Sequence, residues 1–247
     1  MARRQDIMTT LDEWLQPERF QDYCPNGLQV EGRQQVRRIV SGVTASQALI
    51  DAAIEEGADL ILVHHGYFWK GEDQRITGMK RRRLQALLAG EINLVAYHLP
   101  LDDHPLYGNN QQLARILGIE QAEPLDGLVW HGFLPEPLSP AALADHLAER
   151  LGRRPLHVGN GQADIRRLAW CTGAAQGFIG KALAGGADAF ISGEISEPTT
   201  HSAREEGIHY YAAGHHATER YGVQALGQAL AETFGVEHRF IDCDNPV

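Results

Sequence analysis

The sequence is poor in cysteine, and this scarcity excludes two kinds of small-domain scaffold. Its 247 residues include only three cysteines, Cys24, Cys171 and Cys243. They are widely spaced, so they form neither a disulfide framework nor a CxxC metal knuckle. An odd number of thiols is typical of a reducing compartment. We therefore expect a cytoplasmic protein.

Long apolar runs are also missing. The most apolar windows, Leu60–Val63 and Ala187–Ile191, are far shorter than the roughly 20 residues that a membrane-spanning helix needs. The N-terminal residues 1–16 carry charge, but no apolar stretch follows, so no signal peptide is expected. We expect no membrane partner.

Positive charge is in deficit, with 22 Lys and Arg against 32 Asp and Glu, for a net charge of -10. This balance argues against a dedicated nucleic-acid binder, although a local basic patch on an acidic protein leaves that activity open. A hydrophobic content of 43% excludes a wholly disordered chain. The length suits one large or two small domains.

Apolar patterning alternates between short strands and amphipathic helices along the whole chain. The expected strands cover residues 38–43, 59–63, 92–97, 167–171, 188–191, 208–212 and 236–243. The expected helices lie near residues 7–15, 46–56, 80–88, 110–117, 140–151, 178–184, 200–206 and 215–234. This alternation predicts an α/β fold.

The two halves of the chain resemble each other. Gly57-Ala-Asp59 aligns with Gly186-Ala-Asp188, and the same offset aligns Ile50 with Ile179. An internal duplication predicts two related α/β lobes, which we place at residues 1–125 and 126–247, with a cleft between them. The C-terminal helix and strand are free in this scheme to pack back on the first lobe.

Histidines and carboxylates follow three of the expected strands, at their carboxyl ends. His64 and His65 close the strand of residues 59–63, and His98 and Asp102 follow the next strand. Ligands bind at the carboxyl ends of strands in open α/β sheets. The glycine after His65 allows a turn that lets both imidazoles face one site.

The third cluster lies in the second half of the chain. His215 and Glu219 are four residues apart at the start of an expected helix, so they share one face and can chelate one ion. Imidazoles and carboxylates together bind divalent ions such as Zn, Mn, Fe or Ni. Two such ions about 3.5–4 Å apart activate a bridging water.

Several stretches of the chain resemble the Nif-three-like dinuclear-metal-centre family, and above all its bacterial YbgI-type members. These stretches are residues 23–32 (YCPNGLQVEG), 42–46 (GVTAS), 63–71 (VHHGYFWKG) and 213–219 (AGHHATE). Members of this family are often named GTP cyclohydrolase 1 type 2 homologues. The likeness runs along the full chain.

The resemblance implies two divalent metal ions per chain, bound by His64, His65, Asp102, His215 and Glu219, with Glu219 bridging both ions. It places His98 beside them as a weaker ligand or a proton-transfer group. It also implies two interlinked α/β lobes with the metal site in the cleft between them, assembled as a ring-shaped homohexamer.

Two functions fit these features. The first is a metal-dependent hydrolase of a small molecule, in which activated water attacks a purine ring or a related substrate; GTP itself follows only from the family's name. No GxxxxGK[ST] loop is present to hold a triphosphate. The second is a non-catalytic, metal-containing ring scaffold that binds protein or DNA partners.

Three further features have two interpretations each. Glu194 aligns with His65 in the repeat, and it is either a carboxylate that supports the metal site, as orienting group or general base, or a helix cap. Lys80–Arg83 is either a phosphate contact or a solvated helix face. The aromatic residues 67–69 either stack on a nucleobase or belong to the core or a subunit contact.

Overall fold

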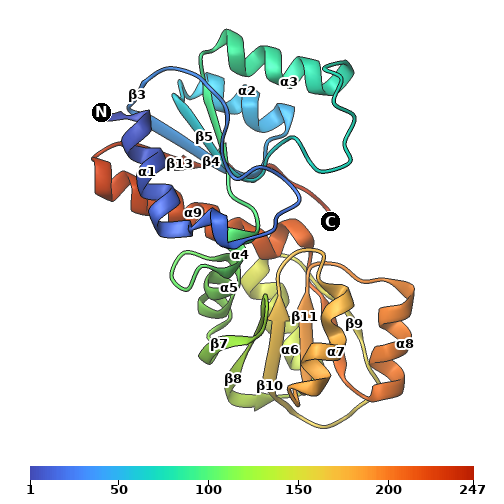
Figure 1. The fold of residues 1–247 in the computed structure, drawn as a ribbon. Coiled ribbons are helices and arrows are strands. Elements are labelled where there is room, and N and C mark those ends of the chain that lie inside the picture. The colour runs from blue at the N-terminus through green and yellow to red at the C-terminus, as the bar shows by residue number, and fades with distance from the viewer. The chain divides into compact units, whose positions relative to one another are not determined.

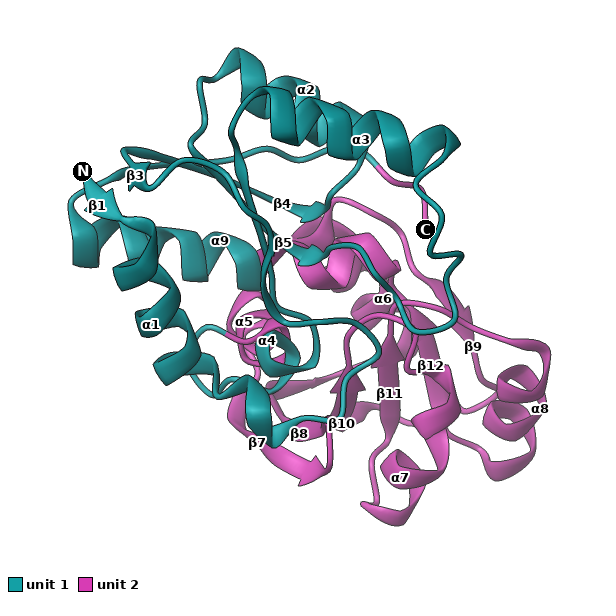
Figure 2. Ribbon diagram, turned by 45° about the horizontal axis from the view of Figure 1, so that its top comes forward, with its two compact units in different colours: residues 1–107, 222–244 teal, residues 108–221, 245–247 magenta.

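A computed structural model describes all 247 residues and divides them into two compact units (Figures 1 and 2). Unit 1 contains residues 1–107 and 222–244, and unit 2 contains residues 108–221 and 245–247. Each unit has its own β-sheet with helices packed on it. The expected α/β class is confirmed.

The sheet of unit 1 has five strands in the order β13-β4-β5-β6-β2. Strands β4, β5, β6 and β13 are parallel, and β2 pairs antiparallel with β6 at the edge. A separate antiparallel pair joins β1 to β3. The strands are β1 (Ala2–Arg3), β2 (Gly27–Val30), β3 (Gln35–Val36), β4 (Arg38–Thr44), β5 (Leu60–His65), β6 (Asn93–Ala96) and β13 (Glu237–Phe240).

Helices cover both faces of this sheet, as Figure 2 shows. Because successive strand residues point to opposite faces, Leu60 and Leu62 of β5 pack in one apolar cluster and Ile61 and Val63 in another. The first cluster includes α1 and α9, and the second includes α2 and α3. The helices are α1 (Arg4–Leu15), a 3-10 turn η1 (Pro17–Arg19), α2 (Gln47–Glu55), α3 (Gly78–Ala89), α4 (Leu99–Asp103) and α9 (His215–Phe234), the last from Gly222 onward.

Unit 2 has a six-stranded sheet in the order β7-β8-β10-β11-β12-β9, with β10, β11 and β12 parallel. Helices α5 and α6 pack on one face of it and α7 and α8 on the other. The strands are β7 (Glu120–Asp126), β8 (Val129–Leu138), β9 (Leu156–Val158), β10 (Ile165–Cys171), β11 (Ala189–Ser192) and β12 (His209–Ala212). The helices are α5 (Asn109–Leu117), α6 (Pro140–Leu151), η2 (Gln176–Phe178), α7 (Ile179–Ala184) and α8 (Glu197–Glu206).

The sequence repeat recurs in the register of the strands. Ile39 of β4 is paired with Leu60 of β5, and Leu168 of β10 is paired with Ala189 of β11, at the same offset of 129 residues. Asp59 accepts hydrogen bonds from the backbone N–H groups of residues 37 and 38, at 2.7 and 3.2 Å. Asp188 accepts the equivalent bonds from residues 166 and 167, at 2.9 and 2.8 Å. The aspartate of the Gly-Ala-Asp motif therefore bonds the backbone at the start of the neighbouring strand in the same way in both units.

The division of the chain falls at residue 107 rather than at the expected residue 125. Residues 108–125 belong to unit 2 because Leu113 and Leu117 of α5 pack with Trp130 and Trp170, and because β7 pairs with β8. Residues 222–244 belong to unit 1, where β13 extends the sheet beside β4. The β7–β8 hairpin was not predicted, since most side chains of β7 are exposed and apolar residues do not alternate along it.

We predict that Asn93→Ala lowers the free energy of unfolding by about 2–4 kcal/mol, because it leaves buried backbone groups without partners. The Asn93 side chain is fully buried and accepts from the Gly32 N–H at 2.9 Å. It also donates to the carbonyl oxygens of Arg33 and Asp59, both at 2.9 Å. Chemical denaturation measures the change. The exposed Glu55→Ala is the control, and equal effects of the two substitutions would contradict the prediction.

Candidate metal centre

The carboxyl end of β5 presents two histidines in unit 1. His64 is fully buried; its Nδ1 donates to the carbonyl oxygen of Tyr97 at 3.0 Å, and its Nε2 lies 3.5 Å from Oδ1 of Asp102 in α4. The Nδ1 of His65 lies 3.2 Å from Oγ1 of Thr44, the residue paired with it on β4. Their ring centroids are 4.5 Å apart, so the two imidazoles lie side by side.

The turn that follows requires glycine. A Cβ atom on Gly66 would lie 2.1 Å from Oε1 of Gln29, whose side chain also accepts from the Tyr67 N–H at 2.7 Å. The same Cβ atom would lie 2.7 Å from Cβ of Ala96, so a larger residue at position 66 would force the neighbouring chain to shift. The two imidazoles thus lie close together, as the sequence predicts.

His98 joins this cluster from the end of β6. Its ring centroid lies 5.1 Å from that of His64 and 5.8 Å from that of His65. Potential ligand atoms of the three histidines all lie within 4.8 Å of one another. The three side chains are therefore close enough to share one ion.

Asp22 fixes the orientation of His98. The Nδ1 of His98 donates to Oδ1 of Asp22 at 2.6 Å, and the backbone N–H of Leu99 donates to Oδ2 at 2.9 Å. Asn26 accepts from the backbone N–H of His98 at 2.8 Å. Burial alone would raise the pKa of Asp22, but hydrogen bonds from His98 and Asn26 outweigh it and lower the pKa to about 2. This carboxylate was not among the sequence candidates; its place directly before the Tyr23-Cys-Pro-Asn stretch was the available signal.

Cys24 lies beside the same pair. Its sulfur and the ligand atoms of Asp22 and His98 lie within 4.8 Å of one another. Burial, together with the charge of Asp22, raises the pKa of the Cys24 thiol to about 12. Because the thiolate is the metal ligand, this cysteine is poorly suited to that role at neutral pH.

Unit 2 presents a second set of donors where α9 begins. His215 donates from Nδ1 to Oε1 of Glu194 at 2.7 Å, and its Nε2 lies 3.0 Å from Oε2 of Glu219, four residues on. Burial alone would lower the pKa of His215, but the carboxylates of Glu219 and Glu194 outweigh it and raise the pKa to about 9. A metal ion at this pair therefore competes with a proton.

Glycine allows this second set to pack closely. A Cβ atom on Gly173 would lie 2.1 Å from Oε1 of Glu219, and one on Gly193 would lie 2.6 Å from Cα of His215. Glu194 does not cap the following helix, because Ser196 occupies the N-cap position of α8. Its contact with His215 is that of an orienting carboxylate.

The hydrogen bonds define which nitrogen each histidine offers. In His64, His98 and His215, Nδ1 faces an oxygen that only accepts, so Nδ1 carries the proton. In the neutral ring, Nε2 then holds the lone pair. This is the arrangement in which imidazoles bind metal ions or transfer protons.

Residues 2–246 match the model of a protein family described as Duf34/NIF3 (NGG1p interacting factor 3). The chain belongs to this family. A Pseudomonas aeruginosa relative named GTP cyclohydrolase 1 type 2 homolog is 63% identical over 245 residues, which cover 97% of each chain. The resemblance to the Nif-three-like family is thus confirmed.

Solved structures of the Duf34/NIF3 fold align along the whole chain. A structure titled "Structural genomics, protein ybgI, unknown function" has a TM-score of 0.97 at 52% identity and covers 100% of both chains. The crystal structure of TTHA1606 from Thermus thermophilus has a TM-score of 0.92 at 38% identity, again over 100% of both chains. No helix of the protein is long and apolar enough to span a membrane.

We predict that Asp22→Asn destabilises the metal-free protein by about 1.5–3 kcal/mol near pH 7, since hydrogen bonds to a charged group are lost. A carboxyl whose folded-state pKa is lowered stabilises the fold above its ordinary pKa of 3.8, and this contribution is lost as the pH falls toward about 2. Denaturation of both proteins in EDTA at pH 7 and pH 3 measures the difference. A destabilisation of the same size at both pH values would contradict the prediction.

Proposed function

We propose that the protein is a dinuclear-metal-dependent hydrolase. Its two divalent ions, drawn from Zn, Mn, Fe or Ni, would be bound by His64, His65 and Asp102 of unit 1 together with His215 and Glu219 of unit 2, with Glu219 as the bridge. The observation that carries the proposal is the hydrogen bond from Nδ1 of His64 and of His215 to an oxygen acceptor, which leaves Nε2 of the neutral ring as the atom for a metal ion.

The spacing of the donor atoms supports metal binding. Ligand bonds of about 2.0–2.2 Å place two nitrogen or oxygen donors of one ion about 3 Å apart. Nε2 of His64 lies 3.5 Å from Asp102, and Nε2 of His215 lies 3.0 Å from Glu219. Each unit therefore contributes one imidazole–carboxylate pair with the dimensions of a metal site.

A bound pair of divalent ions would supply the activation of water for hydrolysis. The protein's own residues would transfer protons and orient the ligands. His98, oriented by Asp22, has Nε2 available to accept and return a proton close to His64 and His65. Glu194 holds His215 in the orientation that presents Nε2.

The name of the relatives, GTP cyclohydrolase 1 type 2 homolog, makes GTP the first substrate to test, with attack at C8 of the purine ring. The family resemblance further implies a ring-shaped homohexamer, which light scattering would detect. The three cysteines form no disulfide bond, which supports a cytoplasmic setting.

We predict that the purified wild-type protein carries about two divalent ions per chain, as a dinuclear centre requires. His65→Ala and Glu219→Ala should each lower this ratio while the fold is retained. Elemental analysis of untagged protein gives the ratio, and circular dichroism reports the fold. His201→Ala, an exposed histidine of α8, is the matched control. Metal content unchanged in both site variants would overturn the ligand assignment.

We predict that hydrolysis of GTP or a related purine substrate requires the metal and falls by roughly 10²–10⁴-fold in His98→Gln, the range of a lost general acid or base. Turnover by metal-depleted and reloaded protein tests the first part. Elemental analysis of His98→Gln separates the two roles of this residue, because a ligand loses metal and a proton-transfer group does not. Equal turnover with and without metal would overturn the hydrolase mechanism.

A further inference from the structure

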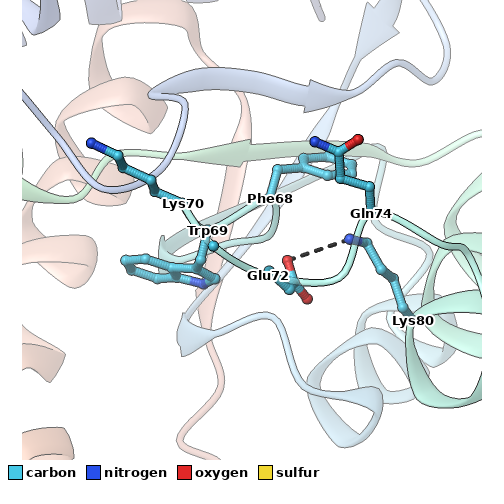
Figure 3. Close-up of a pocket in the computed structure, with 7 residues that line it drawn as sticks. Phe68, Trp69, Lys70, Glu72, Gln74 and Lys80 are labelled. Carbon is cyan, nitrogen blue, oxygen red and sulfur yellow. Dashed lines mark ion pairs between the residues drawn. The ribbon is translucent and has the colours of Figure 1, made fainter.

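A pocket of about 410 Å³ lies in unit 1 on the segment that follows His65 (Figure 3). Its volume is in the range of small-molecule binding sites. Its lining residues are Phe68, Trp69, Lys70, Gly71, Glu72, Gln74 and Lys80. We call it the Phe68 pocket.

The backbone of Phe68 has a conformation that residues other than glycine rarely adopt. Its φ angle is +65°, and 38% of the residue is exposed. Such strain persists only where the neighbouring structure fixes it. On one side, the Tyr67 hydroxyl donates to the Ala45 carbonyl oxygen at 2.7 Å; on the other, the Lys70 N–H donates to the Tyr23 carbonyl oxygen at 2.6 Å. The ring is therefore presented to solvent by a segment anchored at both ends.

Trp69 connects the pocket to the histidines of unit 1. Its indole N–H donates to the Gly66 carbonyl oxygen at 3.2 Å, which sets the position of the ring. The same ring contacts His98 edge-on, with centroids 4.9 Å apart, and lies 6.0 Å from His65. A molecule seated against this indole would be next to the imidazoles.

Lys80 supplies a positive charge to the pocket. In Figure 3, Trp69 lies on one side of Glu72 and Lys80 lies on the other. Its ammonium lies 3.4 Å from Glu72 and 5.2 Å from the centre of the Phe68 ring, and it donates to the Asp73 carbonyl oxygen at 3.1 Å. Lys70 also lines the pocket, and in Figure 3 its side chain points away from Lys80 and Glu72. An anionic group in the pocket would compete with Glu72 for the Lys80 ammonium, while Gln74 offers both a donor and an acceptor to the edge of a heterocycle.

We propose that the Phe68 pocket binds a planar heteroaromatic ring that carries a phosphate group, as in a nucleoside monophosphate. Phe68 and Trp69 contact the ring, and Lys80 contacts the phosphate. The further step, that this pocket positions the substrate of the metal centre, rests on the proposed function. Binding itself requires no metal.

Calorimetric titration of the EDTA-treated full chain with GMP, guanosine and inorganic phosphate tests the proposal. GMP should bind more tightly than either of its parts. Lys80→Met should weaken GMP binding by about tenfold or more, the effect of one lost charge-assisted contact, and leave guanosine binding unchanged. Phe68→Gly, which tolerates the positive φ angle, should weaken the binding of both GMP and guanosine.

Lys181→Met is the matched control. Lys181 lies 5.1 Å from the centre of the Phe178 ring and 3.2 Å from Asp126, so it reproduces the same arrangement in unit 2. This substitution should not change GMP binding. GMP that binds no more tightly than phosphate, or equally well to Lys80→Met and wild type, would overturn the proposal.

The two proposals fail separately. Metal loss in His65→Ala without any GMP binding would refute the pocket and leave the metal centre standing. GMP binding that depends on Lys80, in a protein that takes up no metal, would refute the hydrolase and leave the pocket standing.

Discussion

The hydrogen bond from a histidine Nδ1 to an oxygen acceptor is the interaction on which the candidate site depends. Tyr97 supplies this oxygen to His64 through its backbone, Asp22 supplies it to His98, and Glu194 supplies it to His215. Each bond fixes the ring orientation and, in the neutral ring, one tautomer, so that Nε2 is then the atom offered to a metal ion. Without its partner, the fully buried His64 would be an unsatisfied polar group that destabilises the fold.

The two units share the same strand register but carry different side chains at corresponding positions. Asp59 in unit 1 and Asp188 in unit 2 each accept hydrogen bonds from the start of the neighbouring parallel strand. The residues paired between these strands in the two units differ by a constant 129 positions. However, β5 ends in His65, whereas the corresponding residue of unit 2 is Glu194, two positions beyond the end of β11. One unit thus offers a nitrogen donor where the other offers a carboxylate that orients a histidine. The repeat supplies the positions of the side chains, and their identities decide the roles.

The segment between strand and helix differs most between the units. In unit 1, residues 66–77 separate β5 from α3, and they carry the aromatic rings of the Phe68 pocket. In unit 2, only residues 193–196 separate β11 from α8. The longer segment gives unit 1 room for the Phe68 pocket beside its histidines.

The sequence by itself determined the α/β class, the bounds of α6 and α9 and the clustering of histidines at strand ends, because these follow from local periodicity and from the order of elements along the chain. Only the tertiary structure decided that Asp22 orients His98, since 76 residues separate them. It also decided that β7 pairs with β8 and that β13 lies beside β4. Edge strands with exposed side chains carry little apolar pattern, and contacts between distant segments depend on how the whole chain packs rather than on any local signal.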